Sequence, residues 1–72
     1  MDSYKLASIY SLACLRIESA STELYESLFD DAGEPIKNVD LANENIRLFQ
    51  RQVSAEADFI RQAIKEYLDE RG

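Results

Sequence analysis

The chain has 72 residues, enough for one domain at most, and 46% of them are hydrophobic. It contains one cysteine, Cys14, and no histidine, so it can form no intrachain disulfide and lacks the usual ligands of a structural zinc site. A domain of this size buries only about 60% of the surface that its unfolded chain exposes, and most small folds add disulfides, a metal or association. We therefore expect self-association or a bound partner to supply the missing stability.

The first predicted element is a long helix over about residues 3–31. Asp2 or Ser3 can accept hydrogen bonds from the free backbone amides of its first turn. Gly33 and Pro35 are spaced as at a helix C-terminus, with Gly33 as the residue that leaves the helix in the left-handed conformation. The sequence therefore predicts that this helix ends shortly before Gly33.

A loop over about residues 32–39 leads to a second predicted helix over about residues 40–70, which Asn38 or Asp40 can cap. No segment shows the sustained alternation of apolar and polar residues that is typical of a half-buried strand. A joint of about eight residues makes the two helices antiparallel neighbours. The predicted fold is all-α: a single antiparallel two-helix hairpin.

Each predicted helix carries side chains at intervals of seven residues, which align them along one face. The apolar rows are Tyr10, Ile17, Leu24 on the first helix and Ile46, Val53, Ile60, Tyr67 on the second. The companion rows are Leu6, Ala13, Ala20, Ser27 and Ala42, Phe49, Glu56, Ala63. Two such seams pack together at a shallow angle. From them we predict the residues of an oligomeric core: Tyr10, Ala13, Ile17, Leu24, Ile46, Phe49, Val53, Ile60 and Tyr67.

Further apolar residues lie outside these rows, and one neighbouring helix cannot cover so wide an apolar arc. The segment 9–17 is apolar on nearly every side of the first helix. Two explanations stay open, and they can coexist. The first is a homodimer that forms a four-helix bundle. The second is a groove that accepts a helix of another protein.

The net charge of −6 is concentrated in one stretch of the chain. Six acidic residues and no basic residue lie between Glu18 and Glu34, whereas the rest of the chain carries equal numbers of both. Direct binding to nucleic acid needs clustered basic residues, so we expect none. The acidic stretch suits a protein partner with a basic surface, although it can also serve only to keep a small protein in solution.

We expect a cytoplasmic protein with no membrane partner. No stretch is apolar and long enough to span a bilayer, and the N-terminus does not resemble a signal peptide. A lone cysteine suits a reducing compartment. Without histidine the chain has neither a Ser-His nor a Cys-His nucleophile, and it has no glycine-rich phosphate loop. We therefore expect no catalytic residue, no metal and no cofactor.

One group of carboxylates favours an alternative function. Glu23 and Glu26 are three residues apart, as are Glu66 and Asp69, and such pairs on adjacent helices can hold Mg²⁺. The pattern resembles the ExxE…ExxD arrangement of the MazG-like nucleotide pyrophosphohydrolases, over four residues only and with a longer spacer than in that family. The resemblance implies Mg²⁺-dependent hydrolysis of a nucleotide. In a hairpin the two pairs lie at opposite ends, so they would meet only across a head-to-tail dimer.

An aromatic pair inside the acidic stretch is the best candidate for recognition of a partner. Tyr25 and Phe29 are four residues apart, outside the apolar row, and acidic residues surround them. Charge steers encounter, while buried aromatic groups supply much of the affinity. The alternative is that the pair covers the loop end of a bundle. We predict a non-enzymatic interaction module, such as a small adaptor, co-chaperone, antitoxin-like protein or phage-encoded inhibitor. Its predicted partner-binding residues are Tyr25, Phe29, Glu18, Glu23, Glu26 and Asp30.

Overall fold

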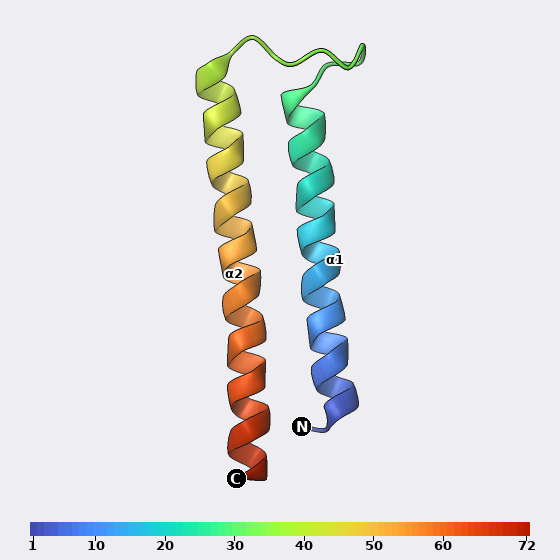
Figure 1. Ribbon diagram of the computed structural model, residues 1–72, viewed down its shortest axis with the longest axis vertical. Helices are drawn as coiled ribbons and strands as arrows, with labels where there is room; N and C mark the ends of the chain where they lie inside the picture. The colour runs from blue at the N-terminus through green and yellow to red at the C-terminus, as the bar shows by residue number, and fades with distance from the viewer.

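The computed structural model describes residues 1–72 and contains two long helices joined by a loop (Figure 1). Helix α1 spans Ser3–Leu28 and helix α2 spans Val39–Arg71. The helices lie side by side and antiparallel, and both termini are at the end away from the loop. The all-helical two-helix hairpin predicted from the sequence is confirmed.

Both helices begin where the sequence supplies a side-chain acceptor for a backbone amide. The Asp2 carboxylate accepts a hydrogen bond from the Lys5 amide at 2.7 Å, and the Asn38 side chain accepts one from the Leu41 amide at 3.0 Å. The first-turn amides of a helix have no partner inside the helix, so these bonds stabilise the two starts. The cap of α2 is Asn38 rather than Asp40, and the helix begins directly after it.

The end of α1 differs from the prediction. The helix ends at Leu28 rather than near residue 31, because Phe29 adopts an extended conformation. The backbone of Phe29 pairs with that of Pro35 in an isolated antiparallel bridge. Gly33 has a φ of 78°, but it lies in a turn within the loop. The prediction that Gly33 ends α1 as its left-handed C-terminal residue is therefore wrong.

Asp30 provides the physical reason for the early end of α1. One oxygen of its carboxylate accepts hydrogen bonds from the Ala32 and Glu34 amides, both at 2.9 Å. The Asp30 amide donates to the Glu34 carbonyl at 2.9 Å, and the Ile36 amide donates to the Leu28 carbonyl at 2.8 Å. Aspartate side chains that bind nearby amides offer the backbone an alternative to the helix. The loop is therefore held in place by hydrogen bonds among its own residues.

The hairpin is a single layer, two helices wide. Its Cα atoms extend over 53 × 20 × 7 Å. Only Ala13, Ala63 and Glu56 are buried, and no large side chain is fully covered. The exposed surface is 5659 Å², whereas a compact protein of 8.2 kDa exposes about 4,500 Å². The chain therefore leaves roughly 1,100 Å² more surface uncovered than a compact fold of its size.

The two helices meet along the companion rows. Ala13 is fully covered and Ala63 nearly so, because small side chains let the helices approach closely. Tyr10 and Ile46, which the sequence placed in an oligomeric core, are exposed in the hairpin. The other predicted core residues are half-buried: Ile17, Leu24, Phe49, Val53, Ile60 and Tyr67.

Ala13→Leu tests this close approach. We expect it to lower the free energy of unfolding by about 1–3 kcal/mol, because a larger side chain at a fully covered position forces the helices apart. Ala55→Leu, at an exposed position of α2, is the control and should change stability by less than about 0.5 kcal/mol. Urea unfolding followed by circular dichroism measures both. Equal stability of the two variants would contradict the close contact at Ala13.

Candidate protein-binding surface

The side chains that flank the seam differ between the two broad faces of the hairpin. A residue three positions after a seam residue lies on one side of the seam, and a residue four positions after it lies on the other side. Four positions after the companion rows, no residue is charged: Tyr10, Ile17, Leu24, Ile46, Val53, Ile60, Tyr67. Three positions after them, most residues are polar or charged: Ile9, Arg16, Glu23, Asn45, Gln52, Phe59, Glu66. We call these two sides the apolar face and the polar face.

Each face carries a groove between the helices. The groove on the polar face, near the loop, has a volume of about 420 Å³ and is lined by Ala20, Glu23, Leu24, Ser27, Asn45, Leu48, Phe49 and Gln52. The groove on the apolar face, at the open end, has a volume of about 320 Å³ and is lined by Ser3, Leu6, Ala7, Tyr10, Ile60 and Ile64. The first groove combines a carboxylate and two amides with an apolar floor. The second is lined almost entirely by hydrocarbon.

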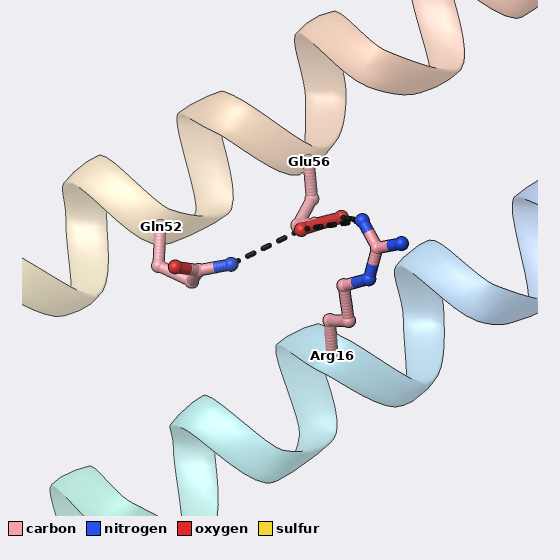
Figure 2. A network of polar contacts seen from close by, with 3 residues as sticks. All are labelled: Arg16, Gln52 and Glu56. Atoms are coloured by element: carbon pink, nitrogen blue, oxygen red, sulfur yellow. Dashed lines mark hydrogen bonds and ion pairs between the residues drawn. The ribbon is translucent and has the colours of Figure 1, made fainter.

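An ion pair crosses the seam at the middle of the polar face (Figure 2). A guanidinium nitrogen of Arg16 on α1 donates to both carboxylate oxygens of Glu56 on α2, each at 3.3 Å. The Gln52 amide donates to the same carboxylate at 3.1 Å. The Arg16 guanidinium also lies over the Phe59 ring, 5.0 Å from its centroid. Glu56, the one buried charged side chain, is therefore fully partnered.

This network fixes how the two helices align. A buried carboxylate without a partner is costly, so only registers that keep Glu56 opposite Arg16 are favourable. Sliding either helix by one turn would separate the two side chains by about 5.4 Å along the axis. Gln52 belongs both to this network and to the lining of the polar groove. The ion pair therefore also holds one wall of that groove in place.

The two predicted aromatic residues lie together at the loop end of α1. The rings of Tyr25 and Phe29 stack with their centroids 4.7 Å apart and an angle of 30° between their planes. Tyr25 is 61% exposed, whereas Phe29 is half-buried and its backbone pairs with Pro35. Phe29 thus has a structural role in the loop, and Tyr25 is the aromatic side chain free to contact another molecule.

The four predicted acidic residues have different surroundings. Glu23 lines the polar groove, while Glu18 and Glu26 are exposed on α1. None of these three forms an ion pair within the chain. The Asp30 carboxylate instead bonds the loop backbone. Three of the four carboxylates are therefore available to a partner, and the fourth shapes the loop beside them.

Reasoning from the sequence missed the groove and the ion pair. Asn45, Leu48 and Gln52 gave no signal, since they line a groove only because of how α2 lies on α1. Glu56 did give one, because it is the only charged residue in a companion row otherwise made of Ala42, Phe49 and Ala63. A charge at a seam position indicates a buried partner on the facing helix.

On the apolar face, Tyr10 interacts with the only cysteine. Hydrogen bonding to the Cys14 thiol raises the pKa of the Tyr10 hydroxyl, and the charge of that sulfur and partial burial act in the same direction. The hydroxyl is therefore neutral at physiological pH. No charge from Tyr10 interrupts this face.

The carboxylates of the alternative function stay apart within one hairpin. Glu23 and Glu26 lie toward the loop end of α1, whereas Glu66 and Asp69 lie toward the open end of α2. No three carboxylate or cysteine side chains are grouped closely enough to hold a metal ion.

No protein-family model, curated protein or solved structure matches the chain. Neither helix contains a stretch long and apolar enough to cross a bilayer. The class that the structure itself defines is an all-α helical hairpin with two unlike faces. Function must therefore be inferred from those faces.

Removing the arginine of the ion pair should destabilise the hairpin. We expect Arg16→Ala to lower the free energy of unfolding by about 1–3 kcal/mol, because Glu56 stays buried without its charged partner. Replacing both residues, with Arg16→Met and Glu56→Leu, should restore most of that loss. Arg47→Ala, which removes an exposed pair with Glu44, is the control and should cost less than about 1 kcal/mol. Urea unfolding of all variants measures the effect, and an unchanged Arg16→Ala protein would contradict it.

Proposed function

We propose that the protein is a non-enzymatic protein–protein interaction module that acts by occupying the surface of another protein. The observation that carries this proposal is the apolar surface that the hairpin leaves uncovered. Twelve large apolar side chains are exposed, although the chain has only two helices with which to cover them. Extensive exposed apolar surface rimmed by polar residues marks interaction sites in proteins. An adaptor, co-chaperone, antitoxin-like protein or inhibitor would use such a surface.

The scaffold of this module is a homodimer in which two hairpins form a four-helix bundle. A single layer of two helices encloses no core, since every large apolar side chain keeps some contact with solvent. A second layer would cover one face of each hairpin and turn its half-buried rows into a core. The dimer therefore supplies the stability that disulfides and metals supply to other small domains.

The surface for the other protein is the acidic loop end. Tyr25 is exposed there, and Glu18 and Glu26 have no partner within the chain. The polar groove adds Glu23 above an apolar floor that includes Leu48. This combination suits a partner with basic side chains next to apolar ones, because charge steers the encounter and apolar contact holds the complex.

Tyr25→Ala tests the partner-binding surface. We expect at least a tenfold loss of affinity, about 1.4 kcal/mol, since an exposed aromatic at an interface centre carries much of the binding energy. Tyr4→Ala is the control, because Tyr4 is still more exposed but lies on α1 at the opposite end. Pull-down from a lysate with mass spectrometry identifies proteins retained by the wild type and by Tyr4→Ala but lost with Tyr25→Ala. Titration of the identified partner then gives the affinities, and equal binding by both variants would contradict the assignment.

The homodimer makes a separate prediction. Multi-angle light scattering at high micromolar concentration should give about twice the 8.2 kDa mass of the chain. Dilution should shift the mass toward the monomer and lower the helical signal in circular dichroism, because stability depends on concentration in such dimers. A fully folded 8.2 kDa monomer at every concentration would contradict the homodimeric scaffold.

A further inference from the structure

We infer that a second copy of this chain packs on the apolar face, with the loops of the two copies at opposite ends. This inference rests on the homodimer proposed above and deepens it by assigning the face and the arrangement. It also leaves the polar groove uncovered for another protein.

The area of the apolar face matches what a stable dimer needs. The whole hairpin extends over 53 by 20 Å between its outermost Cα atoms, which sets the outline of either broad face. This outline, roughly 1,000 Å², is close to the roughly 1,100 Å² by which the chain exceeds the surface of a compact protein. Covering that area on both copies removes about 2,000–2,200 Å² in total from solvent, which is in the range of obligate homodimers.

The distribution of charge selects the apolar face over the polar one. A second copy on the polar face would remove Glu23 and Glu66 from water, and a charge buried without a partner is unfavourable. The flank row of the apolar face contains no charged residue, and its groove at the open end is lined almost entirely by hydrocarbon. Side chains of the second copy can fill that groove without desolvating a charge.

The next row outward shows which residues would touch the second copy. In a four-helix bundle each helix has two neighbours, one in its own hairpin and one in the other hairpin. The directions from the helix to these two neighbours are about 90° apart. One position after the companion rows lie Ala7, Cys14, Ser21 and Leu28 on α1 and Asn43, Gln50, Ala57 and Ile64 on α2. Ala7, Cys14 and Ser21 are small, and they allow close approach of a facing helix along most of α1.

Charge repulsion favours loops at opposite ends. The acidic stretch 18–34 at the loop end carries six acidic residues and no basic one. The open end is nearly neutral, since Lys5, Arg61, Lys65 and Arg71 are balanced by Asp2, Asp58, Glu66, Asp69 and Glu70. Opposite ends therefore keep the acidic stretches of the two copies apart. Loops at the same end would bring two acidic stretches together, and like charges at such close range repel.

This arrangement predicts which residues meet at the two-fold axis. Arg16 lies opposite Glu56, and Met1 lies opposite Glu70, so the numbers of residues at the same level add to about 72. Cys14 is thus level with Asp58, next to Ala57, and lies near the middle of α1. With the loops at opposite ends, Cys14 faces Cys14 of the second copy, and Ala57 faces Ala57. With the loops at the same end, Cys14 would face Ala57 of the second copy.

Disulfide cross-linking tests the face and the arrangement together. The reduced full chain is oxidised with diamide at a concentration where light scattering gives a dimer, and cross-linked dimer is measured on non-reducing gels. We expect wild type, through Cys14, and the Cys14→Ser, Ala57→Cys variant to cross-link at least tenfold faster than the Cys14→Ser, Ala55→Cys control. Ala55 and Ala57 are both exposed residues of α2, but Ala55 lies on the polar side.

The other outcomes overturn the inference in distinguishable ways. Cross-linking only in a chain that carries both Cys14 and Ala57→Cys would show loops at the same end. Fast cross-linking of the Ala55→Cys variant alone would place the dimer on the polar face. In both cases the homodimer proposed above stands and only this inference fails. A monomer at every concentration would overturn both, whereas the partner-binding role of Tyr25 is measured independently.

A pair of charge substitutions tests the face without cysteines. Tyr10 and Leu12 are both exposed on α1, the first on the apolar face and the second on the polar side. We expect Tyr10→Glu to shift the mass from light scattering to that of the monomer, because it places a carboxylate in the contact. Leu12→Glu should leave the dimer unchanged. A dimer in the first variant together with a monomer in the second would overturn the assignment.

Discussion

Two helices lying side by side can cover only one row of side chains on each other, and the rest of this structure depends on that constraint. The covered rows contain small residues, since Ala13 and Ala63 are the apolar side chains that are buried. At these two positions the helices approach too closely for a larger group. Large apolar side chains beside the seam, such as Ile17 and Ile60, are half-buried because one side stays open to solvent.

A seam of small residues repeated every seven positions would fit equally well in several registers. The buried pair of Arg16 and Glu56 removes this freedom, because a carboxylate inside the seam needs its partner at one place. The grooves exist only in that register, since their walls come from both helices. This polar network therefore determines the shape of the surface.

Under the proposed function, the two faces meet two different physical demands. Burial against a second copy would require surface without charge, and the flank rows of the apolar face carry none on either helix. Reversible binding of another protein is better served by charge around a few apolar groups, as at Tyr25 and the polar groove. Under the proposed function, one face stabilises the scaffold and the acidic end recognises the partner.

The sequence by itself determined the class of fold and the antiparallel pairing. These follow from local properties: helix periodicity, the caps at Asp2 and Asn38, and a joint too short for anything but a hairpin. It did not determine the end of α1, because the bonds from the Asp30 carboxylate to the loop amides outweigh the turn signal of Gly33.

Only the tertiary structure decided which residues share a groove and that Arg16, of all the basic residues, pairs with Glu56. Both depend on the relative position of two helices, and that position is a property of the packed pair rather than of either segment.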